Sequence, residues 1–513
     1  MHCSPLFDIL SAKILAKSSL FFALFGESGM YKTDKGHQIS FFDFNQSCGM
    51  QLDPNNEWII LAERIPWDSC EELYAGMFPS NTGRPALPVR IALGSLIIKQ
   101  RKHLSDRSVV KEIKENPYLQ YFIGFTKFQK EEPFTAPVLV EFRKRIDADF
   151  LAIVNDIILA QSTPTKEHDK DNENDRARQV YEMPDEYGNV GTEILDATVS
   201  PSNIRYPQDF SLTNEARGKL EVMIDGIHKA HHPWKKPRTY RRIARKEYLA
   251  LAKSKKKSAK AIRAYLRRDL GRILRDMGYI EQYLSAGYEL SESDMAMYKT
   301  IQELYRQQKY MFDNKTHTVE NRIVSLNQPY IRPIVRGKAK APVEFGAKYD
   351  VSIDEKGHAR LEKINFEPYN ESTIFIDTIE RYRKRTGHYP KRVLVDKIYR
   401  TRENLRFCKE HHIEISGPKL GRPVGNGAGI SPNAKQDEKD RIEIERFFSL
   451  DKRCNGAGLI MTKLSDTTLN TIALTILVTN LFATETNTFF VLYFMDCGNY
   501  PTQQQFIEID PAA

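Results

Sequence analysis

Apolar residues recur at helical spacing through residues 88–147, which predicts a compact helical module. The segment "LPVRIALGSLIIKQRK" follows a break marked by proline. In "LSDRSVVKEIKENPYLQYFIGF", Ser105 is a plausible N-cap and Pro117 ends the helix. "APVLVEFRKRI" closes the unit with a basic last turn. We therefore expect a helical domain over residues 50–150, and its pattern is equally that of a DNA-binding and of a dimerisation domain.

After this module the pattern changes. Residues 163–179 are polar and charged and have no apolar periodicity, so a charged linker is predicted over residues 151–185. "EILDATV" then has the composition of a buried strand and places Asp196 at or near its end. Further along, "APVEFGAKYDVSIDEKGHARLEKINFEP" predicts two strands joined by a turn at residues 355–357.

The following segments alternate between helical and strand patterns. "STIFIDTIERYRKRTG" predicts an amphipathic helix, and "KRVLVDKIYR" predicts a short buried strand with Asp396 at its end. "TRENLRFCKEHHI" is a helix, "EISGPKL" a strand, and "GRPVGNGAGISPNAKQ" a Gly/Pro-rich mobile loop that leads to a last helix, "RIEIERFFSLDKR". This order of elements predicts an α/β fold, an RNase H-like mixed sheet with helices on both faces, joined to an all-helical N-terminal domain.

The changes of pattern divide the chain into successive parts. These are an atypical extension at 1–49, the helical domain at 50–150, the linker at 151–185, the sheet domain at 186–490 with a helical insertion at about 210–330, and a tail at 491–513. An internal start at Met30 would account for the extension.

The apolar run over residues 471–494 requires a decision about membranes. Asn480, Glu485 and Asn487 interrupt it, so a buried helix followed by a strand is expected there, and no membrane span. The six cysteines are scattered and form no CxxC pair, which argues against structural zinc and a disulfide framework and favours the cytoplasm.

Charge is distributed unevenly along the chain. The whole chain of 513 residues has a formal charge of +9, whereas residues 229–275 contain 18 Lys and Arg against two acids. Such concentrated positive charge repels itself unless something neutralises it, which favours a basic helical insertion that holds phosphates over a merely solvated hairpin. The candidate contacts to DNA in this segment are Arg241, Arg242, Lys255, Lys256 and Lys257.

The last predicted helix carries acids and cations in a defined arrangement. At about 100° per residue, Arg441, Glu445 and Lys452 fall within about 40° of one another, while Glu443 lies about 200° from Arg441. One interpretation is a solvated helix with ion pairs between successive turns. The other is an acid placed beside cations because its substrate is a polyanion.

Three carboxylates occupy comparable places in the predicted sheet domain. Asp196 and Asp396 would come from neighbouring strands, and Glu445 would reach across from a packed helix. Carboxylates that converge in this way form an oxygen-rich site suited to two Mg²⁺ or Mn²⁺ ions, which can support phosphodiester transfer. Arg441 and Lys452 would then hold the phosphates of the strand being cut.

These residues also resemble a known family. Arg441, Glu445 and Lys452 match the Arg-Glu-Lys part of the Tyr-Arg-Glu-Lys signature of bacterial insertion-sequence DDE transposases, although Glu438 stands at the tyrosine position. The blocks "LDATVSPSNIRYPQDFSLTNEAR", "IRPIVRGKAKAPVEFGAKYDVS", "VLVDKIYRTRENLRF" and "GPKLGRP" are similar to this family as well. The resemblance extends over roughly residues 50–480.

The resemblance implies a DNA transposase with Asp196, Asp396 and Glu445 as catalytic and metal-binding triad. Such an enzyme cleaves at the terminal inverted repeats of its own element and joins the 3′-OH ends to target DNA. Two ends require two active sites, so a homodimer on DNA in the nucleoid is expected. Tyr399 and Arg402, which follow the second acid, are further candidate DNA contacts.

Two alternatives use the same residues differently. A nuclease on the same fold would cleave DNA without joining ends. A catalytically inactive protein would bind element ends only, and the presence of all three acids argues against it.

Overall fold

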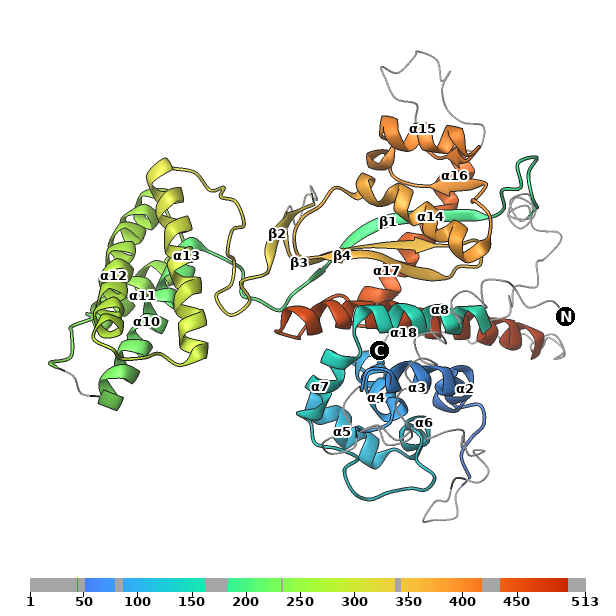
Figure 1. Ribbon diagram of the computed structural model, residues 1–513, viewed down its shortest axis with the longest axis horizontal. Coiled ribbons are helices and arrows are strands. Elements are labelled where there is room, and N and C mark those ends of the chain that lie inside the picture. Colours follow the sequence, from blue (N-terminus) through green and yellow to red (C-terminus); the bar gives the residue numbers. More distant parts are fainter. Residues whose placement is uncertain are drawn as a thin grey trace, which may run out of the picture.

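The chain folds into a helical domain, a sheet domain and a projecting helical bundle (Figure 1). The computed structural model describes residues 44, 51–78, 86–161, 183–231, 234–336, 343–417 and 434–496. The predicted N-terminal extension, most of the predicted linker, most of the Gly/Pro-rich loop and the end of the tail lie outside the described residues.

The N-terminal domain is entirely helical in the residues that are described. Its helices are α2 (Glu57–Arg64), α3 (Trp67–Ala75), α4 (Val89–Arg101), α5 (Asp106–Glu115), α6 (Pro117–Phe122), α7 (Val138–Arg145) and α8 (Ala148–Gln161). Ser105 caps α5 as predicted, because its Oγ accepts a hydrogen bond from Ser108 N at 3.1 Å. Helix α8 extends into the range predicted for the linker, since Leu151, Val154 and Ile158 are buried.

The last helix, α18 (Ser465–Asp496), joins the N-terminal domain to the sheet domain. Leu474 and Leu477 belong to the core of the N-terminal helices, whereas Ile472 and Ile476 pack into the core under the sheet. The prediction of a helix followed by a strand was wrong in its second half, because α18 continues without a break to Asp496. In its first half, apolar residues on opposite sides of the helix pack into two different cores. No helix in the described ranges has the length and apolar character needed to cross a membrane.

The sheet is mixed and is built around β1. Its strands are β1 (Thr192–Pro201), β2 (Arg332–Val335), β3 (Val343–Ile353), β4 (Ala359–Asn365), β5 (Arg392–Leu394) and β6 (Glu414–Ile415). They are ordered β2-β3-β1-β5-β6, and β4 also pairs with β3. Strand β1 runs antiparallel to β3 and parallel to β5.

Helices cover both faces of this sheet, as predicted, and the alternation along β1 determines which residue meets which face. Leu195 packs with α14 (Phe375–Thr386) and α15 (Arg402–Glu410). Ile194 packs with α17 (Ile442–Cys454) and α18 on the other face. The predicted α/β fold class is thereby confirmed.

The predicted basic helical insertion lies between β1 and β2 as a bundle with its own core (Figure 1). Its helices are α10 (Asp209–His231), α11 (Arg241–Lys253), α12 (Ala259–Ser285) and α13 (Glu292–Asn314). Leu220, Ile224, Ile273, Ile280 and Ile301 are buried between them.

Candidate active site

The ladder between β1 and β5 places two carboxylates at one edge of the sheet. Its last paired residues are Ile194 and Leu394, and both pack on the α17 face. Asp196 and Asp396 each follow two residues later, so strand alternation directs both side chains toward that same face, although the paired register itself ends at Leu394. The two acids, 200 residues apart in sequence, therefore both follow the last paired residues of this ladder and are directed toward the same face of the sheet.

Asp196 is half-buried within β1, and its Oδ1 accepts a hydrogen bond from Ala197 N at 2.7 Å. It does not end the strand as expected, because pairing with β3 continues to Pro201 opposite Gly346. Burial raises the pKa of Asp196, while the nearby positive charge of Arg441 and of Arg336 acts in the opposite direction. Arg441 therefore lies close enough to influence this carboxyl group.

Asp396 is exposed and begins a 3₁₀ turn, η2 (Lys397–Tyr399). Its Oδ1 accepts a hydrogen bond from Lys397 N at 2.6 Å and so caps the turn. The backbone at Asp396 is extended, which keeps the alternation of β5 up to this residue.

Helix α17 packs against β1 through Ile444, Phe447 and Phe448. Lys452 Nζ donates a hydrogen bond to Thr198 Oγ1 of β1 at 2.6 Å, and Arg441 acts on Asp196. Both cations thus lie on the flank of α17 that faces the acidic edge of the sheet.

Glu445 shares that flank with the two cations. On a helix it lies within about 40° of Arg441 and about 20° of Lys452, and its side chain is exposed. Glu443 lies on the opposite flank, where Glu443 Oε1 is 3.9 Å from Arg446 Nη1. The orientation of α17 therefore favours Glu445 over Glu443 as the acid directed toward the edge.

Buried polar contacts fix α17 in this orientation. Arg392 of β5 makes ion pairs of 2.9 Å with Asp437 and 2.6 Å with Asp440, which hold the preceding helix α16 (Ala434–Asp440). At the other end, Asp451 Oδ2 accepts a hydrogen bond from Tyr349 OH of β3 at 2.7 Å. Burial raises the pKa of Asp451 to about 6.

The donor groups fit a hard divalent cation. Carboxylate oxygens are what Mg²⁺ and Mn²⁺ prefer, and Asp196 and Asp396 share an edge and a face. Within the described ranges, no three His, Cys, Asp or Glu side chains are gathered closely enough to hold a metal ion. In the described residues, Asp196, Asp396 and Glu445 thus do not form one closed set of three ligands.

Arg441 is partly exposed and carries one buried donor without a hydrogen-bond partner among the described residues. That donor is its Nε. A buried donor without a partner costs free energy, which a phosphate oxygen of a bound strand would recover.

Sequence reasoning missed some residues around Asp196. Arg336 Nη1 donates to Ala197 O at 3.2 Å, and Glu371 contributes to the raised pKa of Asp196. The sequence feature that could have pointed to this environment is Asp350, an acid within the largely buried strand β3. Tyr399 is fully buried and its hydroxyl donates to Asp350, so it is not the exposed DNA contact that was expected.

The basic residues of the insertion fall into two groups. Arg241 makes two hydrogen bonds of 2.7 Å to Asp225 of α10, so this charge is neutralised within the bundle. Arg242 and residues 255–257, in the connection between α11 and α12, are exposed. Acids of neighbouring helices therefore neutralise part of the concentrated positive charge, and the exposed cations remain candidates for phosphate contacts.

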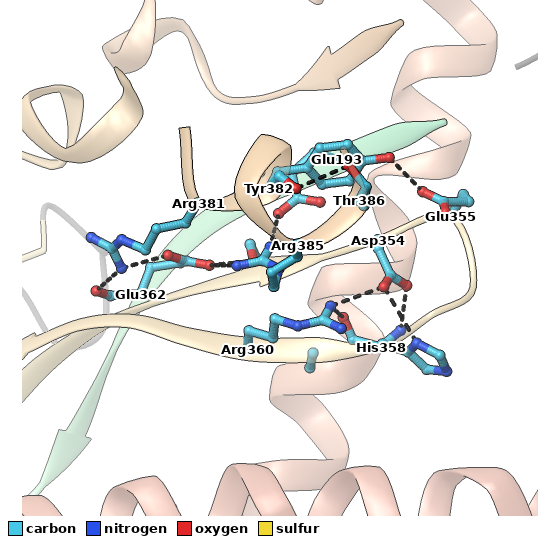
Figure 2. A network of polar contacts seen from close by, with 12 residues as sticks. Glu193, Asp354, Glu355, His358, Arg360, Glu362, Arg381, Tyr382, Arg385 and Thr386 are labelled. Atoms are coloured by element: carbon cyan, nitrogen blue, oxygen red, sulfur yellow. Dashed lines mark hydrogen bonds and ion pairs between the residues drawn. The ribbon is translucent and has the colours of Figure 1, made fainter. Parts of the chain in front are cut away.

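A second group of carboxylates lies near the other end of β1 (Figure 2). We call it the arginine-paired cluster, and it comprises Glu193, Asp354, Glu355, His358, Arg360, Glu362, Arg381, Tyr382 and Arg385. Arg385 Nη2 lies 3.4 Å from Glu193 Oε1, and Arg360 Nη1 lies 2.9 Å from Asp354 Oδ2. Glu193 and Glu362 are buried and Asp354 nearly so, and each of the three has an arginine partner.

Comparisons with known proteins add independent information. A family model described as "Transposase domain (DUF772)" matches residues 46–145, and one described as "Transposase DDE domain" matches residues 393–482. The chain is 30% identical over 197 residues to "Uncharacterized protein ORF8 in nfe locus" of Rhizobium meliloti. That match covers 38% of this chain and 83% of the relative. No solved structure matches the chain.

Proposed function

The chain belongs to the DDE transposases of insertion sequences, and we propose that it cleaves DNA at the terminal inverted repeats of its own element and joins the ends to target DNA. The observation that supports this proposal best is that Asp196 and Asp396 both follow the paired residues Ile194 and Leu394, which lie on the face of the sheet covered by α17. The flank of α17 that faces this edge carries Glu445 between two cations.

Asp196, Asp396 and Glu445 would hold two Mg²⁺ or Mn²⁺ ions. When bound, such ions stabilise the negative charge that develops on the attacking and leaving oxygens of a phosphodiester. The proposal requires Glu445 to approach the two aspartates in the complex with metal and DNA. Its exposed side chain, which no neighbouring residue covers fully, leaves it accessible for that role.

The residues of the chain itself would orient the DNA. The guanidinium of Arg441, which is partly exposed and lies near Asp196, would donate to a phosphate oxygen, and Lys452, which is held by Thr198, would add positive charge on the same flank. Water would first break the bond between the 3′ oxygen of the element and the adjoining phosphorus. The freed 3′-OH would then form a new bond to a phosphorus of the target, with loss of that target's own 3′ oxygen.

Binding of the DNA outside the active site would rest on exposed cations. Arg242 and residues 255–257 are accessible on the insertion, whereas Arg241 is committed to Asp225. Processing both ends of an element would require a homodimer on double-stranded DNA, acting in the cytoplasm at the nucleoid.

The test compares wild type with Glu445→Gln and with the matched control Glu443→Gln, on DNA that carries the element's end. We expect Glu445→Gln to reduce Mg²⁺-dependent cleavage and strand joining by roughly a thousandfold or more while end binding persists. Glu443→Gln should retain activity, since Glu443 lies on the far flank of α17.

Equal activity in Glu445→Gln and wild type would contradict the assignment of the third acid. Cleavage without joining by wild type would identify a nuclease. Tight binding without cleavage by wild type would identify an inactive end-binding protein.

A further inference from the structure

Asp396 lies beyond the ladder that aligns β5 with β1. The paired residues end at Ile194 and Leu394, and Asp396 follows two residues later in the turn η2. Backbone pairing therefore fixes Leu394 relative to β1 and does not extend to the carboxylate that follows it. Two metal ligands must keep a separation set to within about 0.5 Å, so another contact has to hold this turn.

Tyr399 provides such a contact from within the same turn. Tyr399 N donates to Asp396 O at 3.0 Å, which closes the turn. The Tyr399 side chain is fully buried, and its hydroxyl donates to Asp350 Oδ1 at 3.1 Å. Asp350 lies opposite Ala197 in the ladder between β3 and β1. The turn that carries Asp396 is thereby tied to Asp350 of β3, which lies opposite Ala197, the residue next to Asp196.

Other contacts hold the chain that follows the turn. Asn404 Nδ2 donates to Tyr399 O at 2.7 Å and to Ser372 O at 3.0 Å. Arg400 Nη1 donates to Ile415 O of β6 at 2.9 Å and to Ser416 O at 2.7 Å. These contacts fasten the backbone to α15, to η1 (Glu371–Ile374) and to β6, while the Tyr399 hydroxyl reaches β3.

We propose that Tyr399 and Asp350 are positioning residues that set Asp396 at ligand distance from Asp196. The inference rests on the proposed function, because it assigns to Asp396 the role of a metal ligand. Tyr399 touches neither metal nor DNA in this account and acts through the turn. Asp350 also accepts a hydrogen bond from Tyr369, so the acceptor stays held when the Tyr399 hydroxyl is removed.

The test is Tyr399→Phe, with Tyr382→Phe as its matched control. Tyr382 is as fully buried as Tyr399, and its hydroxyl lies 3.0 Å from Val190 O and 3.1 Å from Glu355 Oε2 of the arginine-paired cluster (Figure 2). Each variant loses one buried hydroxyl, and only Tyr399→Phe loosens the turn of Asp396. Thermal unfolding measures how much stability each variant loses.

For Tyr399→Phe we expect a tenfold or greater fall in kcat for cleavage of end DNA and a comparable rise in the Mg²⁺ concentration for half-maximal rate. Mn²⁺ binding, followed by electron paramagnetic resonance without turnover, should weaken by a similar factor. The Kd for end DNA should stay unchanged. Tyr382→Phe should match wild type in all of these. Asp350→Ala removes the acceptor and keeps the tyrosine, so it should cause the same rise in the Mg²⁺ concentration for half-maximal rate and the same loss of Mn²⁺ affinity. It also provides the test if Tyr399→Phe does not fold.

Asp396→Asn separates the inference from the function on which it rests. Cleavage by Asp396→Asn at the wild-type rate would show that the proposed site itself is wrong. An inactive Asp396→Asn, together with Tyr399→Phe and Asp350→Ala that match Tyr382→Phe in kcat and Mn²⁺ affinity, would overturn the positioning role alone.

Discussion

The arginine-paired cluster and the candidate active site (Asp196, Asp396 and Glu445) both consist mainly of carboxylates, but they differ in their cationic partners. In the arginine-paired cluster, Arg360 and Arg385 lie beside the buried acids Asp354 and Glu193 (Figure 2). In the described part of the chain, no cation lies within ion-pair distance of Asp396 or Glu445, and both are exposed. Acids with fixed cationic partners are already neutralised, whereas exposed acids without them can accept a metal ion.

Within the arginine-paired cluster, the pKa values of two acids shift in opposite directions. Although burial opposes ionisation of Asp354, its hydrogen bonds from His358 and its attraction to Arg360 hold its pKa well below the usual range. Burial raises the pKa of Glu193 to about 8, and Arg385 offsets this only in part. Arg360 also bonds Asp156 of α8 at 2.8 Å, so the cluster connects the N-terminal domain to the sheet. We infer that the cluster is structural and that the other group is catalytic.

The largest effect on this comparison is expected from Arg360→Ala. The substitution leaves Asp354 buried without its guanidinium partner and removes the bond to Asp156. We expect a loss of about 3–5 kcal/mol in the free energy of unfolding, measured by urea denaturation, because breaking the pair leaves a charge on Asp354 that His358 compensates only in part. Cleavage per folded molecule should remain that of wild type.

Arg402→Ala, an exposed arginine at the start of α15, serves as the control and should leave stability unchanged. A stable Arg360→Ala that has lost cleavage would reverse the assignment of the two groups.

A smaller effect concerns the pH dependence of stability. Glu193 has a pKa of about 8 in the folded chain, against an ordinary value of 4.5. Between these values the folded chain binds a proton that the unfolded chain has released, so stability falls as pH rises, by up to about 1.4 kcal/mol per unit. Glu193→Gln should flatten the unfolding free energy between pH 5 and 8 and should leave cleavage unchanged. If the free energy of unfolding changed with pH in the same way in wild type and in Glu193→Gln, the assignment of this pH dependence to Glu193 would be contradicted.

The smallest expected effect concerns DNA binding by the basic insertion. Replacing Lys255, Lys256 and Lys257 with alanine should weaken binding to any DNA and lower the slope of log affinity against log salt by up to about three. The control is Arg306→Ala on α13, whose guanidinium lies 2.6 Å from Glu303. Fluorescence anisotropy at several salt concentrations measures both. An unchanged slope in the triple variant would exclude these lysines as phosphate contacts.

Local patterns were sufficient to predict the elements that carry the acids. The apolar segments around Asp196 and Asp396 predicted two strands, and the spacing of Arg441, Glu445 and Lys452 predicted the flank of α17 that faces β1. The ladder between β1 and β5 then brings the first two acids to one edge.

Partners that are distant in sequence could not be predicted. Glu193 lies three residues from Asp196 in the same strand, yet alternation sends it to the other face, where it meets Arg385 of α14. Tyr399 follows Asp396 closely and looked like a surface residue, but its hydroxyl is bound by Asp350. The role of each acid depends on these long-range contacts, which leave no local signal.

The central claim is that metal binds at Asp196 and Asp396 and not at the arginine-paired cluster. It is tested most directly by iron-directed cleavage of the chain. Fe²⁺ that replaces Mg²⁺ generates hydroxyl radicals in the presence of ascorbate and peroxide, and these cut the backbone nearby. We predict cuts near residues 196 and 396 that excess Mg²⁺ suppresses and that Asp396→Asn abolishes. Cuts near residues 354–362, or cuts that persist in Asp396→Asn, would contradict the account.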